Sequence, residues 1–477
     1  MNASCTIVWF RNDIRLADHP ALHSAFDRGD EIIPVYIHST EDDDNWSAGA
    51  ASRWWLHHAL SDLDDRLDAL KSRLTVREGN PLDVLRTLIR ETGASTIGWN
   101  RRYEPAGMEY DDLVMEILRK EGVTVEQYGG NVLFEPESVQ TGSGSHFQVF
   151  TPFWEACLSL PEPQKPLDPP DTLKVPCQWP RSIPLERLAL RPSISWAGGI
   201  RASWEPGSAG VEKQLGRLIT DIVKDYKRDR NRPDLPGTSR LSPYLHFGEV
   251  SARRIWHTVR DRAPERSGEA YLRQLGWRDF SIHMVYHVPK TTGQPLKPEF
   301  ESFPWQDAPE ALRAWQRGRT GYPLVDAGMR ELWVTGWMHN RVRMVVGSFL
   351  VKHLLIPWQA GARWFWDTLV DADLANNTMG WQWIAGCGAD AAPYFRIFNP
   401  ILQSKKFDTK GKYIRRWVPE LASLPDDCIH TPWEASPHIL EEAGIVLGET
   451  YPFPIVDHTV ARDLAMKAYK HIRELRQ

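Results

Sequence analysis

Residue types suited to chemistry concentrate between positions 337 and 399. The stretch opens with Trp337, Asn340, Arg341 and Met344, which stand at positions i, i+3, i+4 and i+7 of one run. In a helix these four side chains would lie along one face. A purely structural stripe would not combine an aromatic ring, an amide, a guanidinium and a thioether. We therefore predict a ligand-binding helix face.

Polar and aromatic residues come together again later in this stretch. Asp371, Asp373 and Asn377 offer hydrogen-bonding groups to a polar ligand, and Trp381 and Trp383 come next with two large flat surfaces. Any one of these residues alone is more often a satisfied member of a helical core. As a set they predict a site that binds a polar ligand beside stacking rings.

The elements that must position these residues are helices, because helical periodicity dominates from about residue 208 onward. Residues 237–242, GTSRLS, predict a turn into a helix over residues 242–251. Thr and Ser in the turn can cap that helix, and its N–H groups with Arg240 would form an anion site suited to a pyrophosphate. Capping alone is the commoner use of such residues.

The N-terminal part has a different pattern, in which short strand-like runs alternate with helical patterns. The runs are CTIVWF, EIIPVYIH, SRLTVREG, STIGWN and VTVEQYG. Strand and helix alternating at this spacing predict a doubly wound parallel sheet over residues 1–130.

A doubly wound sheet offers a ligand crevice where its strands end. No GxGxxG or P-loop motif is present, so neither a dinucleotide fingerprint nor a P-loop is predicted. Loop residues that close on each other through salt bridges are the commoner explanation for any single polar residue there. The candidate crevice residues are Phe10, Arg11, Asn12, Asp13, His38, Ser39, Asn100, Arg101, Arg102, Tyr103 and Glu104.

Residues 131–205 are dense in proline, which prevents long helices and central strands. We predict a linker packed over the surface, with a short helix at TPFWEAC. A chain of 477 residues is too long for one core. The expected organisation is therefore a sheet domain (1–130), this linker and a helical domain (206–477).

Composition narrows the function. Residues 206–477 carry a net charge of +6 and residues 1–205 a net charge of −11, so the overall −5 hides a basic C-terminal part compatible with nucleic-acid binding. The 22 tryptophans invite stacking or electron transfer. Five scattered cysteines lack disulfide or zinc spacing, so we expect them reduced and no metal bound. No run is apolar enough to span a membrane, and no signal peptide opens the chain, so we expect a cytoplasmic protein.

Several segments resemble the photolyase/cryptochrome family, in particular its bacterial cyclobutane pyrimidine dimer photolyases. They are WFRNDIRLADHPAL, GTSRLSPYL, WMHNRVRM, DADLANNTMGWQW and YFRIFNP. The resemblance covers nearly the whole chain. It implies a Rossmann-like antenna domain, a long linker and an all-helical domain that binds FAD in a U shape.

The resemblance also assigns residues to FAD. Asn377 should face flavin N5, and Arg343 and Asp371 should form a buried charge pair that would be costly to break. The positions that match flavin contacts are Tyr226, Arg230, Thr238, Ser239, Arg240, Leu241, Ser242, Arg278, Asn340, Arg343, Asp371, Asp373 and Asn377. Trp381, Trp358 and Trp305 match the family's electron-transfer chain, in order from the flavin to the surface.

For the substrate, the resemblance implies a flipped-out pyrimidine dimer, and flipping is cheapest where damage has weakened stacking. Trp277 and Trp383 match the two indoles that sandwich the dimer, and Asn340 and Met344 match further contacts. Gln274 departs from the pattern, because cyclobutane-dimer photolyases typically have glutamate there. An amide donates hydrogen bonds but supplies no acid proton.

A basic set with interleaved aromatic residues surrounds this pocket. Solvated charge is the default explanation for such runs. Beside a damage-binding pocket we expect phosphate contacts from Arg341, Arg396 and Lys406, with Trp277 also touching DNA. The wider set adds Lys405, Lys410, Lys412, Arg415 and Arg416.

The resemblance implies light-driven repair of cyclobutane dimers in ultraviolet-damaged DNA by electron transfer from excited reduced FAD, a carbon-carbon lyase activity. Two alternatives stay open: a cryptochrome photoreceptor, and a (6-4) photolyase, which also has glutamine at the position of Gln274. We expect an antenna chromophore, a reduced folate such as methenyltetrahydrofolate rather than deazaflavin. We also expect a monomer with no obligate protein partner, from class I or the plant-cryptochrome-related class III.

Overall fold

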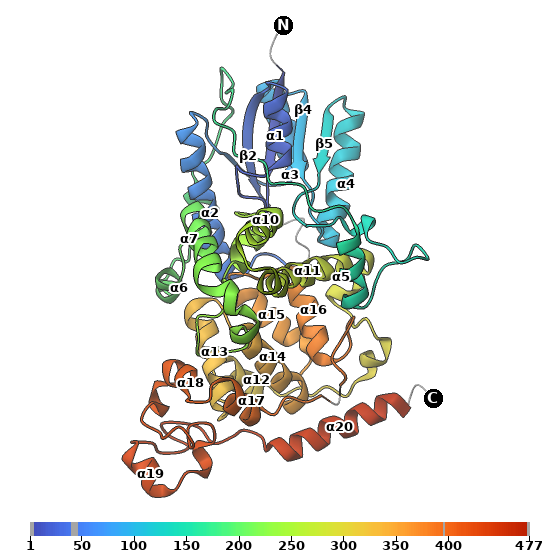
Figure 1. The fold of residues 1–477 in the computed structure, drawn as a ribbon. Helices are drawn as coiled ribbons and strands as arrows, with labels where there is room; N and C mark the ends of the chain where they lie inside the picture. Colours follow the sequence, from blue (N-terminus) through green and yellow to red (C-terminus); the bar gives the residue numbers. More distant parts are fainter. Residues whose placement is uncertain (1–3, 40–45, 395, 475–477) are drawn as a thin grey trace.

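The computed structural model describes residues 4–39, 46–394 and 396–474. Its N-terminal part is one sheet of five parallel strands in the order β3-β2-β1-β4-β5, in the upper half of Figure 1. The strands are β1 (Cys5–Phe10), β2 (Glu31–His38), β3 (Thr75–Glu78), β4 (Thr96–Asn100) and β5 (Thr124–Tyr128). The doubly wound parallel sheet and all five predicted strand segments are confirmed.

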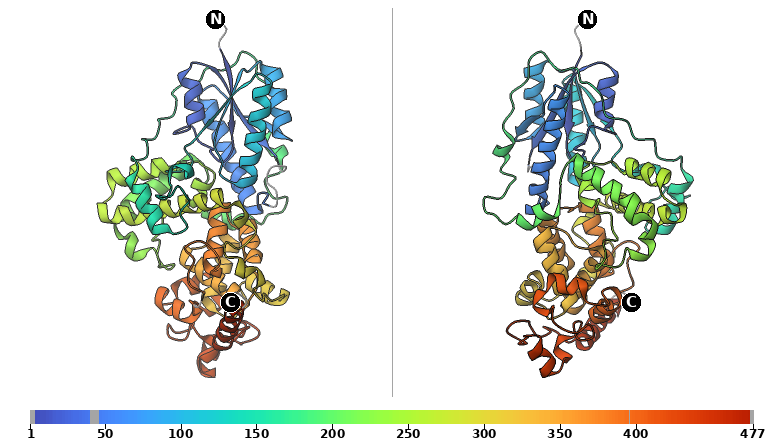
Figure 2. Two further views of the ribbon diagram at one scale, coloured as in Figure 1. Left: turned by 90° about the vertical axis from the view of Figure 1, so that its right-hand side faces the viewer. Right: turned by 60° about the vertical axis from the view of Figure 1, so that its left-hand side comes forward.

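Helices cover both faces of this sheet (Figure 2) because successive strand residues point to opposite sides. Val8 and Phe10 pack in one core with residues of α1 and α2, whereas Ile7 and Trp9 pack in another with residues of α3 and α4. The helices are α1 (Pro20–Asp27), α2 (Ala50–Ala69), α3 (Pro81–Thr92) and α4 (Pro105–Lys120). Continuous apolar strands are therefore buried on both sides.

The proline-rich connector runs as an extended chain between short helices. These are η1 (Pro136–Ser138), α5 (Phe150–Ser159), η2 (Leu185–Leu188) and α6 (Gly198–Ser203). Helix α5 confirms the short helix expected at TPFWEAC. Its apolar side packs into the molecule, since Phe150, Phe153, Trp154 and Cys157 are buried.

The rest of the described chain is mainly helical; most of it forms the lower half of Figure 1, while α7 and α10 lie higher, next to α2 and below the sheet. Its α-helices are α7 (Ser208–Arg217), α8 (Tyr226–Asp229), α9 (Ser242–His246), α10 (Ala252–Arg262), α11 (Glu265–His287), α12 (Pro309–Gln316), α13 (Pro323–Thr335), α14 (Asn340–Ser348), α15 (Trp358–Thr368), α16 (Leu374–Ala385), α17 (Pro400–Phe407), α18 (Lys412–Trp417), α19 (Pro437–Glu442) and α20 (His458–Glu474). Between α7 and α8 the helical pattern is broken by a π-helical turn over Leu218–Ile222.

Two local predictions were wrong. Helix α14 begins at Asn340, where the His339 side chain accepts a hydrogen bond from the Arg341 N–H, so Trp337 lies before the helix rather than on its face. Gly336, with φ of +68°, ends α13 and turns the chain there, a conformation that glycine adopts readily. At α9 the N-cap is Leu241 and no side chain caps the helix.

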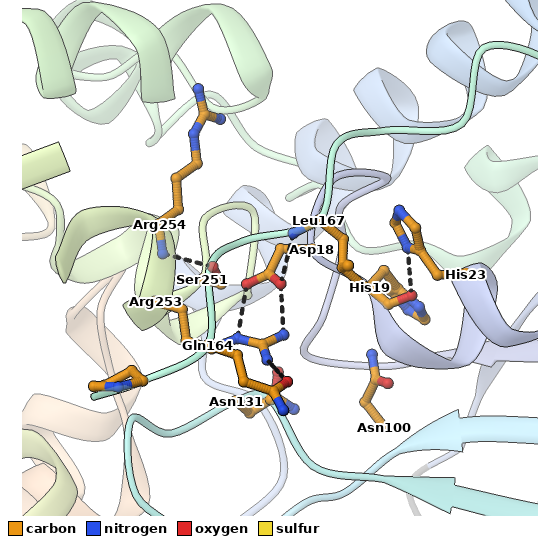
Figure 3. Close-up of polar contacts among 12 residues, drawn as sticks. Asp18, His19, His23, Asn100, Asn131, Gln164, Leu167, Ser251, Arg253 and Arg254 are labelled. Carbon is orange, nitrogen blue, oxygen red and sulfur yellow. Dashed lines mark hydrogen bonds and ion pairs between the residues drawn. The ribbon is translucent and has the colours of Figure 1, made fainter. Parts of the chain in front are cut away.

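A buried ion pair joins the sheet, the connector and the helices (Figure 3). Arg253 of α10 donates to the Asp18 carboxylate at 3.1 and 2.5 Å, and Asp18 also accepts from the Leu167 N–H at 3.2 Å. Both charged side chains are at most one-tenth exposed. Because a buried charge that loses its partner is costly, this contact holds the three regions in register.

Candidate functional site

The Arg343–Asp371 pair forms as predicted. Arg343 Nη2 donates to Asp371 Oδ1 and Oδ2 at 3.0 and 2.9 Å, and the Asp371 side chain is 3% exposed. Ser242 Oγ donates to the same carboxylate at 2.6 Å, and Arg343 Nε donates to the Met338 carbonyl at 2.8 Å. Three predicted flavin residues from α9, α14 and the loop before α16 therefore share one network.

The turn over residues 237–242 joins two further predicted residues. Tyr271 Oη donates to Ser239 Oγ at 2.9 Å, and the Tyr271 ring meets Tyr226 edge-on at 5.1 Å between centroids. The Arg230 guanidinium lies 5.5 Å from the Tyr226 ring. Tyr271, which the sequence did not single out, therefore links α8 to the turn. Thr238 precedes Ser239 in the same segment, and the Leu241 N–H donates to Ser239 Oγ at 3.4 Å.

Arg240 is a candidate to bind the phosphates of a ligand, because its guanidinium lies between aromatic rings and its hydrogen-bonding capacity is not fully used. Its guanidinium lies 4.0 Å from the Trp204 ring and 5.0 Å from the Trp337 ring. In the described chain its Nε is buried and has no hydrogen-bond partner. Burial lowers the pKa of this guanidinium, and the attraction of the Glu331 carboxylate offsets only part of the lost hydration. The phosphates of FAD would supply that charge, so the residues present fit this cofactor.

Asp373 and Arg278 lie where the helical part meets the sheet part, whereas Asn377 contacts α15 within the helical part. Asp373 caps α16 by accepting from the Asn376 N–H at 2.8 Å. Burial raises the pKa of Asp373, but the His246 imidazole, 3.9 Å away, reverses this and the pKa falls to about 2. Asn377 Nδ2 donates to the Ala362 carbonyl at 3.0 Å, and Arg278 Nη1 donates to the Asn131 carbonyl at 2.8 Å.

The three tryptophans of the predicted electron-transfer chain differ in exposure. Trp381 and Trp358 are buried, and Trp305 is half-buried. Gly361 of α15 allows close packing here, since a Cβ on it would lie 2.1 Å from Trp381 Cη2. The order of exposure agrees with a path from the interior to the surface, and the electron-transfer role stays a prediction.

The predicted substrate residues come from three helices. Trp277 and Gln274 lie on α11, Asn340 and Met344 on α14, and Trp383 on α16. Asn340 is exposed and the other four are half-buried. Gln274 Nε2 donates to the Ala270 carbonyl of its own helix at 3.2 Å. Trp277 packs against the core that contains the connector, whereas Trp383 and Met344 pack against the second large core.

Two of the predicted DNA-binding cations meet at one ring. The guanidinium of Arg341 lies 4.7 Å and the ammonium of Lys406 lies 5.3 Å from the centre of Phe407, which the sequence did not single out. Arg341 Nη2 also donates to Asn231 Oδ1 at 2.8 Å. Arg396 is exposed, and the adjacent Phe395 lies outside the described residues.

The predicted crevice of the sheet lies at the carboxyl ends of the strands, facing α9 and α16. A cavity of about 210 Å³ is lined by Asn12, His38, Ser39 and Glu104 together with aromatic residues. A smaller cavity of about 40 Å³ beside it is lined by Asp13, Asn100, Arg101 and Tyr103 and also by the predicted flavin residues Arg278 and Asp373. Both parts of the chain therefore contribute to these cavities.

Charged groups close the base of this crevice. Arg11 Nη1 donates to both oxygens of Asp111 at 2.8 Å, and Arg102 binds the same carboxylate at 2.8 Å. Asp13 lies 3.1 Å from His19. Burial alone would raise the pKa of Asp13, but His19, Arg11 and Arg15 hold it well below the usual range. Arg11, Arg102 and Asp13 thus form the salt bridges considered for these loops.

The described chain contains no metal-binding cluster, no disulfide bond and no membrane-spanning helix. Among residues 4–39, 46–394 and 396–474, no group of three His, Cys, Asp or Glu side chains is arranged to hold a metal ion. The five cysteines are free. No described helix is long and apolar enough to cross a bilayer.

Two family models match the sequence. The model for DNA photolyase matches residues 6–171, and the model for the FAD binding domain of DNA photolyase matches residues 271–471. The chain is 46% identical over 472 residues to the deoxyribodipyrimidine photo-lyase of Agrobacterium fabrum, covering 98% of each. It is 40% identical to cryptochrome-2 of Arabidopsis thaliana over 98% of this chain and 79% of that protein.

Solved structures agree with the sequence matches. A bacterial class III photolyase from Agrobacterium tumefaciens superposes with a TM-score of 0.96 at 45% identity, covering 99% of this chain and 98% of the other. An archaeal photolyase from Sulfolobus tokodaii with two FAD molecules superposes with a TM-score of 0.83 at 30% identity, covering 98% of this chain and 99% of the other. On these grounds the chain belongs to the photolyase/cryptochrome family, and its helical part is an FAD-binding domain.

Proposed function

We propose that this protein uses light to split cyclobutane pyrimidine dimers in DNA, which is the activity of a deoxyribodipyrimidine photo-lyase. The observation that carries the proposal is 46% identity to a protein of that name over 98% of both chains. The likeness to a class III photolyase over 99% of this chain supports the same class within the family.

The residues that would hold FAD are those gathered around the turn before α9. Arg240 would pair with its phosphates, the Ser242–Asp371–Arg343 network would orient that end of the site, and Asn377 would face the flavin ring. When bound, FAD supplies the light-driven donation of one electron to the dimer and the recovery of that electron, so the reaction has no net redox change.

The protein's own task is to bind and orient the lesion. Trp277 and Trp383 would provide two flat apolar walls for a flipped-out dimer. Gln274 would donate a hydrogen bond from its amide to a pyrimidine carbonyl; the amide nitrogen has two N–H groups, so one can stay on the Ala270 carbonyl. Asn340 and Met344 would complete the pocket. Trp305, Trp358 and Trp381 would carry electrons from reductants in the solvent to photoexcited FAD and so keep the flavin reduced.

DNA would be held mainly through its phosphates. Arg341 and Lys406 around Phe407, together with the exposed Arg396, lie on the basic half of the chain. Such contacts are independent of base sequence and weaken with salt. The partner is therefore duplex DNA that carries an ultraviolet lesion.

The 210 Å³ cavity at the sheet is the proposed antenna site. Its lining combines Trp9, Tyr36, Trp46 and Trp366 with polar groups such as Glu104, which suits a flat heteroaromatic molecule with hydrogen-bonding edges. We favour a reduced folate such as methenyltetrahydrofolate over deazaflavin. Adding folate, deazaflavin or excess FAD to purified protein and recording new absorbance bands distinguishes the three.

We also propose domain limits at residues 1–130, 131–205 and 206–477, a monomeric state without an obligate protein partner, and a cytoplasmic location. Size-exclusion chromatography with light scattering tests the oligomeric state. A dimer at micromolar concentration would contradict it.

A cryptochrome photoreceptor is the second candidate, favoured by the 40% identity to cryptochrome-2. A (6-4) photolyase rests on Gln274 alone. The deciding experiment gives photoreduced protein two oligonucleotides, one with a cyclobutane thymine dimer and one with a (6-4) photoproduct, and monitors each lesion under blue light. Repair of the cyclobutane dimer alone is expected. Repair of neither by FAD-loaded protein would favour the photoreceptor.

A further inference from the structure

The connector makes a direct contact with one wall of the proposed lesion pocket. The Phe150 ring at the start of α5 lies parallel to the Trp277 ring, with centroids 3.7 Å apart and planes inclined by 8°. Phe150 is fully buried, and the Arg273 guanidinium covers it at 4.6 Å. Arg273 Nη2 also donates to Thr151 Oγ1 at 3.3 Å, which ties the start of α5 to α11.

Close packing next to Trp277 keeps α5 in place. Trp154, one turn along α5, lies against Gly276 so closely that a Cβ on Gly276 would come within 2.3 Å of Trp154 Cε3. Phe280, one turn after Trp277, meets Phe150 at 5.8 Å and Phe153 at 5.2 Å. Any side chain at position 276 would push α5 away, so the contact depends on glycine there.

The same connector residues also bind the chain beyond Trp383. Asp390 donates its N–H to the Gln148 carbonyl at 3.1 Å, and its Oδ2 accepts from the Phe150 N–H at 3.4 Å. Between Trp383 and Asp390 the chain turns tightly back, because Gly386, Cys387 and Gly388 all donate N–H groups to the Gln382 carbonyl.

These contacts form a continuous path between the two walls of the pocket. It runs from Trp277 through Phe150 to Asp390, and from there through the turn at residues 386–388 to Gln382, the neighbour of Trp383. The two rings pack against different cores, although the helices that carry them, α11 and α16, also contact each other directly. The connector therefore adds a second link between the two walls, and this link touches Trp277 itself.

We infer that the connector segment Gln148–Phe150 positions the two tryptophan walls, because Phe150 stacks on Trp277 and supports its ring. This positioning contributes to the selectivity of the protein for the pyrimidine dimer over undamaged DNA. This inference rests on the proposed function. Phe150 is a positioning residue, because it is buried behind Trp277 and acts on the lesion only through that ring.

The test replaces a flat ring by an aliphatic side chain at two matched positions. Phe150→Leu removes the aromatic ring that stacks on Trp277 and keeps most of the side-chain volume. Phe153→Leu is the control, because Phe153 is equally buried on the same helix but packs on Phe280 and His283. Asp390→Gly tests the other end of the path, because it removes the acceptor of the Phe150 N–H and glycine readily adopts the positive φ of 45° found there.

The readouts are dissociation constants for a dimer-containing duplex and for the same undamaged duplex, together with bound FAD and the melting temperature. For Phe150→Leu we expect affinity for the dimer to fall about tenfold, as for the loss of one aromatic pair. Undamaged-duplex affinity and bound FAD should not change. Asp390→Gly should show a smaller loss of the same kind.

Equal losses of dimer affinity in Phe150→Leu and Phe153→Leu would overturn the inference, because they would show that Phe150 contributes only to the packing of the core and has no specific effect on Trp277. Unchanged selectivity in Phe150→Leu would overturn it as well. Failure of the proposed function gives a different result, since the unmodified protein would then bind both duplexes equally and repair neither. Phe150→Tyr keeps an aromatic ring against Trp277 and should therefore retain most of the selectivity that Phe150→Leu loses.

Discussion

Two arginines, Arg11 and Arg240, show how differently the two halves of this protein treat charge: Arg11 is buried, and Arg240 is half-buried with a buried Nε. At the base of the sheet crevice, Arg11 binds both oxygens of Asp111 at 2.8 Å and also donates to the Asn100 carbonyl. In the helical half, Arg240 touches the rings of Trp204 and Trp337, and its Nε has no partner in the described chain.

The difference separates structural charge from ligand-binding charge. Removing one partner of a buried pair leaves an uncompensated charge, so Arg11 and Asp111 should matter for stability. A cation whose lost hydration is only partly offset costs stability until an anion binds, so Arg240 should matter for cofactor affinity. Family kinship does not make this distinction, because both arginines stand in segments that resemble the family.

The strongest test of the comparison is Asp111→Ala. It removes the carboxylate that Arg11 and Arg102 share and leaves them backbone carbonyls such as those of Asn100 and Gly107, so the free energy of unfolding should fall by about 3–5 kcal/mol. Urea titration monitored by circular dichroism measures the change. Glu116→Ala on the same helix removes only an exposed partner of Lys120 and should leave the midpoint unchanged. A loss as small as that of the control would show that the sheet charges are not structural.

Arg240→Met tests the other half. The variant loses one charge-assisted contact with the phosphates, so FAD affinity should fall roughly ten- to a hundredfold. The FAD-free variant should be about as stable as the unmodified protein, because the lost hydration of this guanidinium outweighs its attraction to Glu331. Flavin fluorescence titration and urea titration measure the two quantities, with the exposed Arg313→Met as control. A less stable FAD-free variant with normal FAD affinity would reverse the comparison.

Asp279, a buried carboxyl group in the helical half, makes the stability of the protein depend on pH. It accepts from the Leu133 and Phe134 N–H groups, and burial raises its pKa to about 6, whereas an unfolded aspartate has about 3.9. The folded state therefore binds more protons between these values, so this group's stabilisation is complete below about pH 4 and is lost as pH rises through 6. Each pKa unit is worth about 1.4 kcal/mol.

Asp279→Asn should remove this loss. We expect the urea midpoint of the variant to vary less between pH 4 and 7 than that of the unmodified protein. The same slope in both proteins would show that Asp279 does not titrate in this range.

The smallest effect is expected for the surface cation Lys406. Lys406→Ala should lower the slope of log affinity against log salt concentration by about 0.9, which corresponds to one phosphate contact, and leave selectivity for the dimer unchanged. Fluorescence anisotropy at several salt concentrations measures it. Lys470→Ala on α20 serves as the control for an exposed lysine outside the basic set. An unchanged slope would remove Lys406 from the DNA contact.

Features that depend on local pattern could be predicted from the sequence. Apolar runs between helical segments identified all five strands, and parallel pairing then placed Asn12, His38 and Glu104 around one cavity. The family resemblance also paired Arg343 with Asp371. Trp337 was placed wrongly, because the periodicity of residues 337–344 continues across a helix start that the His339 side chain decides.

Other features depended on contacts between distant segments. Phe150 stacks on Trp277, Arg240 lies beside Trp204, and Arg341 and Lys406 share Phe407. In each case the partner residue lies outside the segments that attracted attention, and no spacing along the chain encodes the contact.

The sequence by itself determined the family, the sheet and the residue types available to bind flavin and DNA, because these depend on periodicity, composition and motif. Only the tertiary structure decided which charges are paired and which rings support one another. Pairing and stacking act over a few ångströms between residues far apart in the chain, so they are set by how the helices pack.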